Sequence, residues 1–343
     1  MYLNLISRGE LIIVLMFLFL IGLTLSALLT WAVLRIFPRL GLLDFPERYG
    51  LKRARIPYPG GVIFWILATV FFSLFEPLWF LSVSVFVLGI ISFWDDMKPL
   101  SSIFRGIVHI GLAVFVFANG IRIGFVGNPF SSGESINLMS FPALSFVLTV
   151  LWIVIIQNAL NWFDGLRGLS VGVSGIGFLT LGIFGLLRPE VAWESGLPMF
   201  LSMNFFFAGM CAGAFLFFFF GKILLGDTGS QILGFLLAVL SIFAGTKIAV
   251  TLLVLGLPIL DVFLVVMRRV FLEHRSPIAG DQKHLHHNLA RRMGEKKAVL
   301  TLILLSAILG SVGLFLTGVE KFSALVLALF AIVGLSAWAS KAS

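Results

Sequence analysis

Eleven apolar segments, most of them long enough to cross a bilayer, dominate this chain of 343 residues. A transmembrane helix needs about 20 apolar residues, and backbone within the bilayer must satisfy its own hydrogen bonds. The segments lack the alternation of apolar and polar residues that barrel strands require. The sequence therefore predicts an all-α, polytopic integral membrane protein with about 11 transmembrane helices. The predicted spans lie near residues 11–37, 59–75, 78–94, 103–119, 142–160, 169–187, 198–220, 229–245, 248–266, 298–316 and 322–340.

Composition agrees with this fold class and excludes others. The chain is 59% hydrophobic and only 12% charged, whereas soluble domains carry about 25% charged residues. Disorder, a coiled coil and a soluble enzyme are thereby excluded. The first apolar segment is longer than the core of a signal peptide and has no small-residue cleavage pattern, so it predicts a retained helix. We expect one membrane-embedded domain over residues 1–343.

The basic residues predict an orientation. If the loop after the first span is cytoplasmic and sides alternate, most lysines and arginines fall on the cytoplasmic side, where positive charge accumulates. The N-terminus is then outside and the C-terminus cytoplasmic, as for a protein of the inner (cytoplasmic) membrane. The net charge of +8 follows from this bias and does not indicate nucleic-acid binding. The expected outer-side exceptions are Arg8, Arg122, Arg188, Lys247 and Lys321. The polar loops on the cytoplasmic side lie near residues 38–58, 95–102, 161–168, 221–230 and 267–297.

Every aspartate falls at or near the same cytoplasmic side. Acidic residues influence topology little, so this one-sided clustering indicates a functional site. Carboxylates beside many lysines and arginines suit a divalent cation and a phosphorylated substrate. The aspartates are Asp44, Asp95, Asp96, Asp164, Asp227, Asp261 and Asp281.

The adjacent pair Asp95 and Asp96 ends the third predicted span. Neighbouring carboxylates repel each other unless a cation or a proton lies between them, so the pair can bind Mg²⁺ or hold a base of shifted pKa. A solvated helix end before Pro99 is the structural alternative.

A second polar segment follows the fifth predicted span. Asn158, Asn161 and Asp164 are spaced by three residues and share one face if helical. Amide and carboxylate oxygens are ligands that Mg²⁺ accepts, and Gly165 and Gly168 permit a tight turn close to a ligand. The alternative is a polar helix end with a glycine cap.

Asp227 lies in a third segment, Gly226-Asp227-Thr228-Gly229-Ser230, between two spans. A helix that begins here would direct backbone N–H groups at a phosphate. Helix capping by these same side chains is the alternative.

His284, His286 and His287 form the fourth segment. Their spacing allows zinc binding, but no cysteine is nearby and basic residues surround them. Hydrogen bonds to a diphosphate are therefore the preferred interpretation. Asp44, followed by Phe45 and Pro46, belongs to a fifth polar segment. A loop made rigid by proline is the structural alternative for this segment.

Together these segments resemble the polyprenyl-phosphate N-acetylhexosamine-1-phosphate transferases (glycosyltransferase family 4), in particular the bacterial undecaprenyl-phosphate N-acetylglucosamine-1-phosphate transferases. The pattern His284-Leu285-His286-His287 is similar to that branch. The resemblance implies transfer of a sugar-1-phosphate from a UDP-sugar to polyprenyl phosphate, with release of UMP. It also implies Mg²⁺ or Mn²⁺ as cofactor and a place at the first membrane step of cell-envelope polysaccharide synthesis.

The resemblance also implies residue roles. Asp227 matches the metal aspartate, Asn161 the amide beside the metal, and Asp95 and Asp96 the essential catalytic pair together with Asp227. The implied substrate-binding residues are Asp44, Asn158, Asp164, Arg167, His284, His286 and His287.

The chain departs from the family pattern at several positions. Arg167 and Leu224 replace a polar residue and an aromatic residue near the uracil of relatives, and the first loop reads Tyr49, Gly50 and Lys52. Arg167 could instead bind phosphate or stack on a base.

Two other functions stay open at this stage. One is a non-catalytic relative that binds lipid phosphate. The other is a secondary transporter or flippase, whose carboxylates should lie near the middle of the membrane rather than at one edge. Small residues such as Gly172, Gly175 and Gly177 would allow close helix packing in a homodimer.

Overall fold

Long apolar helices make up most of the computed structural model, which describes residues 8–49, 53–127, 135–189, 197–243, 248–274, 276 and 284–340. Within these residues, eight helices are long and apolar enough to cross a membrane. The chain is thus a multi-pass membrane protein of the predicted all-helical type. The eight helices are α1 (Arg8–Leu40), α3 (Trp79–Met97), α5 (Pro142–Phe163), α6 (Leu169–Leu187), α8 (Leu197–Phe219), α9 (Gly226–Phe243), α13 (Glu295–Phe315) and α14 (Gly318–Ser340).

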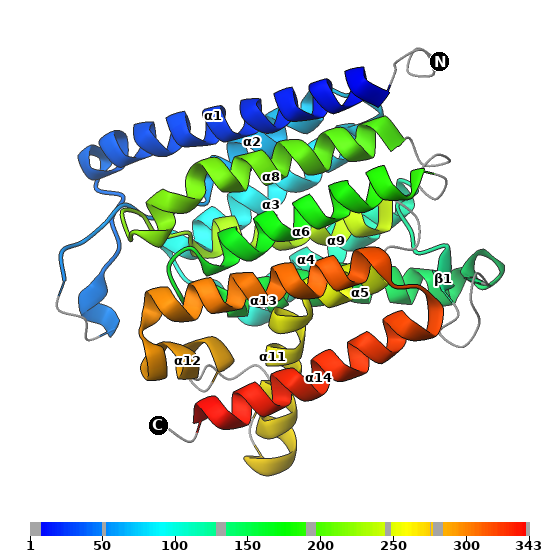
Figure 1. The fold of residues 1–343 in the computed structure, drawn as a ribbon. Coiled ribbons are helices and arrows are strands. Elements are labelled where there is room, and N and C mark those ends of the chain that lie inside the picture. The colour runs from blue at the N-terminus through cyan, green and yellow to red at the C-terminus, as the bar shows by residue number, and fades with distance from the viewer. Residues whose placement is uncertain are drawn as a thin grey trace.

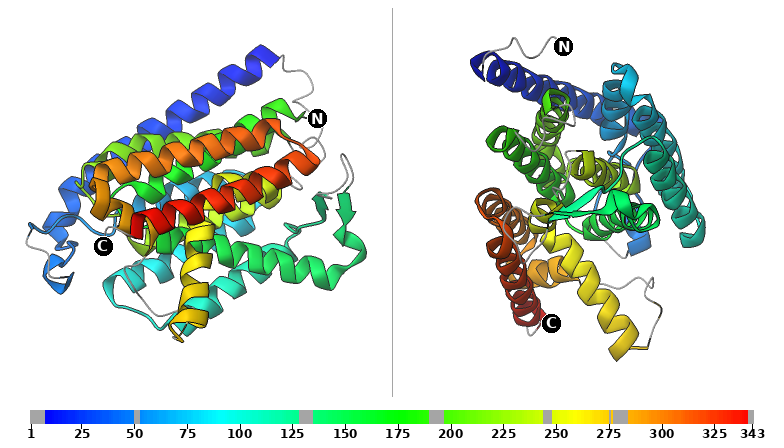
Figure 2. Two further views of the ribbon diagram at one scale, coloured as in Figure 1. Left: turned by 60° about the horizontal axis from the view of Figure 1, so that its bottom comes forward. Right: turned by 90° about the vertical axis from the view of Figure 1, so that its right-hand side faces the viewer.

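The other three predicted spans form shorter helices. Two are α2 (Val62–Ser73) and α4 (Ser102–Ala118). The third is divided into α10 (Ile248–Val254) and α11 (Gly256–Met267). Pro258 explains the break, because its ring would clash with the carbonyl group of Val254 in a continuous helix. After the break, α11 crosses the other helices steeply (Figures 1 and 2). The count of eleven crossings remains a prediction.

Short elements connect the helices at the two ends of the bundle. The start of α1 and the end of α14 lie at opposite ends of the bundle, with α12 near the end of α14 and β1 at the end where α1 starts (Figure 1). The two strands pair antiparallel, with Val126 opposite Ile136. The remaining short elements are β1 (Phe125–Gly127), β2 (Ser135–Asn137), α12 (Leu285–Met293), the 3₁₀ turns η2 (Pro46–Tyr49), η3 (Glu76–Leu78) and η4 (Leu138–Ser140), and the π-helical turn η6 (Arg268–Leu272).

Helix α9 occupies the centre of the bundle. Its side chains are buried along almost its whole length, and it packs against α2, α3, α5 and α6. The right-hand view of Figure 2 looks along the bundle and shows other helices around it. An apolar helix without a polar face is expected in such a position. By contrast, α1 exposes large apolar residues such as Phe17 and Trp31, as a lipid-facing helix does. The N-terminus of α9 therefore meets the ends of several helices.

Candidate active site

Asp96 caps the N-terminus of α9. Its Oδ1 accepts hydrogen bonds from the backbone N–H of Asp227 (2.8 Å) and from the Tyr58 hydroxyl (2.5 Å). Its Oδ2 accepts bonds from the backbone N–H (2.9 Å) and the hydroxyl (2.5 Å) of Thr228. A helix begins with unpaired N–H groups and a partial positive charge, so a carboxylate from α3 is well placed there. Gly226 supplies the left-handed conformation (φ +77°) that starts the helix.

Arg105, on α4, joins two of the predicted carboxylates. One guanidinium nitrogen, Nη1, donates to Asp95 Oδ2 (2.8 Å) and to Asp227 Oδ2 (2.9 Å). The other oxygen of Asp95 accepts from the backbone N–H of Leu100 (2.6 Å). The Asp95 side chain is only 5% exposed, whereas that of Asp227 is 32% exposed. Asp227 is therefore the carboxylate of this group that a ligand can reach.

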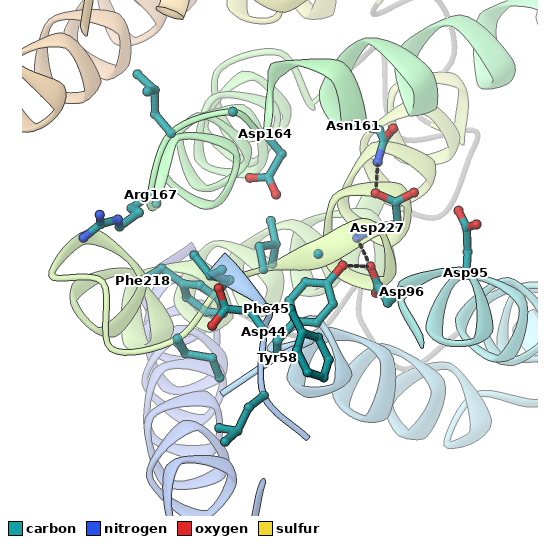
Figure 3. Close-up of a pocket in the computed structure, with 18 of the residues that line it drawn as sticks. Asp44, Phe45, Tyr58, Asp95, Asp96, Asn161, Asp164, Arg167, Phe218 and Asp227 are labelled. Carbon is teal, nitrogen blue, oxygen red and sulfur yellow. Dashed lines mark hydrogen bonds between the residues drawn. The ribbon is translucent and has the colours of Figure 1, made fainter. Parts of the chain in front are cut away.

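Asn161 approaches Asp227 from α5. Its Nδ2 donates to Asp227 Oδ1 (3.0 Å) and to the Ser230 hydroxyl (2.9 Å). Figure 3 shows Asp95, Asp96 and Asn161 near Asp227, and the carboxylate of Asp164, at the end of the helix that carries Asn161, points into the same pocket. Asp95, Asp96, Asn161 and Asp227 thus converge from α3, α5 and α9.

The converging side chains border a pocket of about 1000 Å³, a size typical of ligand sites. The segment before α2 is bonded to the segment before α9 at one wall of the pocket. The N–H of Gly60 donates to Leu224 O (2.7 Å), and the N–H of Gly61 donates to Leu225 O (2.8 Å). A side chain on Gly61 would clash with the Gly229 backbone. The predicted residues that line the pocket are Asp44, Asp95, Asp96, Asn161, Asp164, Arg167, Asp227 and His287.

Asp164 ends α5 and faces the other carboxylates. Desolvation raises the pKa of Asp164 well above its ordinary value of 3.8, and the negative charges of Asp227 and Asp96 raise it further. Six carboxylates and four arginines line the pocket, so the acidic side chains outnumber the basic ones.

Two ion pairs stand at the rim of the pocket. Arg53 binds Asp44 through both carboxylate oxygens (2.5 and 3.3 Å), and Asp44 also accepts from the Ile56 backbone (2.8 Å). Asp44 is thus engaged in closing its own loop. Across the pocket, Glu295 accepts from the backbone N–H of Arg167 (3.0 Å) and pairs with its guanidinium (3.4 Å).

The three predicted histidines divide into two groups. His287 lines the pocket, and desolvation lowers the pKa of this imidazole to about 4, so the ring is neutral at pH 7. His284 and His286 are not among the lining residues. They are buried, and both contact Asp261, which sequence reasoning placed among the clustered aspartates without a role of its own.

Asn158 does not reach the pocket. Its Nδ2 donates to the Val154 carbonyl group (2.8 Å) and lies 3.4 Å from His109 Nδ1. Asn158 shares the α5 surface that packs against α4, so the substrate contact expected for it is not supported by this geometry.

Sequence reasoning missed Arg105 and Tyr58 as site residues, and it named Thr228 only as part of the segment around Asp227. A basic residue ten positions after Asp95 and a tyrosine within a Pro-Tyr-Pro-Gly-Gly segment were available signals, but nothing local joins them to Asp227. Of the residues singled out from the sequence, Gly50, Lys52, Lys247 and Asp281 lie outside the described residues.

Comparison with known proteins gives the family. Residues 78–245 match Glycosyl transferase family 4. The chain is 30% identical over 307 residues to the probable undecaprenyl-phosphate N-acetylglucosaminyl 1-phosphate transferase of Bacillus subtilis (strain 168), covering 84% of this chain and 81% of that protein. The chain belongs to glycosyl transferase family 4. It is a transferase that moves a sugar-1-phosphate to a polyprenyl phosphate, as the resemblance of its motifs implied.

Two other relatives show similarity over comparable shares of the chain. An undecaprenyl-phosphate alpha-N-acetylglucosaminyl 1-phosphate transferase of Thermotoga maritima is 29% identical over 274 residues, which are 79% of this chain and 81% of the relative. A phospho-N-acetylmuramoyl-pentapeptide-transferase of Chlorobium chlorochromatii is 27% identical over 290 residues, 73% of this chain and 76% of the relative. The family 4 match includes Asp95, Asp96, Asn161, Asp164 and Asp227.

Proposed function

We propose that the chain transfers N-acetylhexosamine-1-phosphate from a UDP-sugar to undecaprenyl phosphate, releasing UMP. The reaction would take place at the cytoplasmic face of the inner membrane. It would be the first membrane step of a cell-envelope polysaccharide. N-acetylglucosamine is the first donor sugar to test, because relatives in Bacillus subtilis and Thermotoga maritima are named for it.

One observation carries the proposal: the accessible carboxylate of Asp227 at the start of α9, with Asp95, Asp96 and Asn161 arranged around it. In the transfer, an oxygen of the lipid phosphate would bond to the sugar-bearing phosphorus of the donor. The bond from that phosphorus to the UMP oxygen would break. Phosphoryl transfer of this kind depends mainly on positioning and charge stabilisation. A rigid carboxylate at a helix N-terminus provides such positioning.

The donor atoms fit Mg²⁺ or Mn²⁺. Asp227 and Asn161 each carry a side-chain oxygen of the type that binds such an ion, and Asn161 Nδ2 donates to Asp227 Oδ1 (3.0 Å). Desolvation and the negative charges of Asp227 and Asp96 raise the pKa of Asp164 in the same pocket. A divalent cation relieves such repulsion. Bound to Asp227 with Asn161 beside it, the ion would neutralise charge on the donor diphosphate.

Other side chains of the pocket would position the carboxylates and bind the phosphate groups. Arg105 holds Asp95 and Asp227 at a fixed separation, and the pocket-lining Arg53, Arg167 and Arg291 offer cations to phosphate groups. His287 is neutral at pH 7 and offers a hydrogen bond without adding charge.

A donor screen with purified protein tests the proposal. Undecaprenyl phosphate, Mg²⁺ and several nucleotide sugars would be supplied in detergent, and the nucleoside monophosphate released would be measured. We expect UMP release with a UDP-N-acetylhexosamine and its loss in Asp227→Ala. As a matched control, Glu320→Gln removes a charge from an exposed residue that does not line the pocket. Full activity of Asp227→Ala would refute the assignment.

A further inference from the structure

A buried cluster of Asp261, His284 and His286 lies behind the pocket. Asp261 Oδ2 is 3.1 Å from Nδ1 of His284 and 3.3 Å from Nδ1 of His286. The three residues are 2%, 6% and 0% exposed, respectively. The cluster connects α11 to the start of α12.

The hydrogen-bond donors and acceptors of the cluster determine which ring nitrogens carry protons. Asp261 Oδ1 accepts from the backbone N–H of Leu285 (2.8 Å), which leaves Oδ2 for the two rings. A carboxylate only accepts, and a neutral imidazole carries one N–H. Both rings can therefore bond to Oδ2 only if each carries its proton on Nδ1. The partner of one imidazole nitrogen thus determines which nitrogen is protonated.

His286 links the cluster to the residues that line the pocket. Its ring packs edge-on against Phe163 at the end of α5 (centroids 5.3 Å apart) and contacts the ring of His287 (4.3 Å). A side chain on Gly165 would clash with His286 Nε2. The position of His286 therefore determines the positions of the pocket-lining His287 and of the turn that follows Asp164.

His286 Nε2 is buried without a hydrogen-bond partner among the described residues. With the proton on Nδ1, this atom is a bare acceptor. With the proton on Nε2, it would be a buried donor facing the Gly165 turn. An unpaired buried donor is costly, which favours the Nδ1–H form further.

We propose that Asp261 is a positioning residue for the sugar-1-phosphate transfer. It holds His284 and His286 as Nδ1–H tautomers, and through His286 it fixes His287 and the Gly165 turn against the pocket. The activity part of this inference rests on the proposed function, but the tautomer part does not.

Zinc is the competing occupant, because one ligand atom from each of the three residues lies within 4.8 Å of the other two. Arg269, itself buried, places its guanidinium 5.3 Å from the Trp162 ring, and that ring packs against His284. A cation beside the cluster opposes a second, divalent one.

Histidine tautomers can be measured by NMR without any substrate. The protein would be labelled with ¹⁵N-histidine in detergent, and its five histidines assigned with His284→Gln and His286→Gln. We expect Nδ1–H signals for His284 and His286 in the unaltered protein. In Asp261→Asn, the amide oxygen must still serve Leu285 N–H, so the amide NH₂ replaces Oδ2. Both rings should then change to the Nε2–H tautomer.

Activity measurements separate positioning from folding. Asp261→Asn should raise the KM for the nucleotide sugar about tenfold, with a smaller change in kcat, because the new Nε2–H of His286 would be a buried donor without a partner among the described residues, facing the Gly165 turn. Glu320→Gln, the same type of exchange at an exposed site, should leave the tautomers and KM unchanged. Nε2–H tautomers in the unaltered protein, or one equivalent of bound zinc by elemental analysis, would overturn the inference. If Asp261→Asn does not fold, the tautomers of the unaltered protein still decide it.

Discussion

Replacing Asp96 by asparagine tests whether this residue anchors the site or acts as its base. Asp96 accepts four hydrogen bonds, two on each oxygen. An amide keeps only one acceptor oxygen, so two of these bonds are lost or must reverse. Hydrogen bonds to a charged group contribute about 1.5–3 kcal/mol each, which gives about 3–6 kcal/mol for two. Each oxygen serves one hydroxyl, from Tyr58 or Thr228, and that hydroxyl can turn to accept from the amide. The lower value, about 3 kcal/mol, is therefore expected.

Thermal unfolding in detergent provides the assay. With an unfolding entropy of about 2.1 cal/mol/K per residue, 3 kcal/mol corresponds to a fall of about 4 °C in the unfolding midpoint. Activity should fall with it, because the cap orients Asp227. Tyr58→Phe, which removes one of the four bonds, should lower the midpoint by less. An Asp96→Asn protein with an unchanged midpoint and no activity would show that Asp96 is a base and not an anchor.

Three further outcomes follow from the charges in the pocket. Arg105→Met should reduce UMP release about 10- to 100-fold, because Asp95 and Asp227 lose a charge-assisted partner worth about 1.5–3 kcal/mol. A rate equal to that of the unaltered protein would exclude a role for the Arg105 contacts in activity. Asp164→Asn should raise the unfolding midpoint at pH 8 and not at pH 4, since a raised pKa means that ionisation costs stability as pH rises; no difference between the two pH values would count against a desolvated carboxylate. The pKa of His287 is lowered from 6.5 to about 4, so the unfolded chain takes up its proton first and stability should fall as pH drops from 6.5 to 4. His287→Gln should flatten that slope, and an equally steep slope would contradict it.

The helices could be predicted because each depends on a local property. The runs of apolar residues alone indicate α1, α5 and α9, and the aspartates at one edge already indicated a common site. The break before α11 also has a local cause in Pro258. Pro258 was visible in the sequence, but the apolar segment around it is long enough for one span, so a continuous helix was predicted.

The individual roles could not be predicted, because they depend on contacts between distant segments. Asp96 bonds to Tyr58 and to the backbone of α9, which are 38 and 131 positions away. Arg105 reaches Asp227 across 122 positions. Asn158 has the correct spacing from Asn161, yet it packs against α4 because helical spacing does not say which neighbour a face meets. Likewise, only the fold shows that His284 and His286 share Asp261.

The central claim is that Asp227 and its neighbours hold a divalent cation for the donor diphosphate. Mn²⁺ binding to the purified protein, followed by electron paramagnetic resonance in detergent, tests this claim most directly. We expect a saturable Mn²⁺ site in the unaltered protein and in Glu320→Gln, and its loss in Asp227→Asn. Equal Mn²⁺ binding by Asp227→Asn would contradict the account.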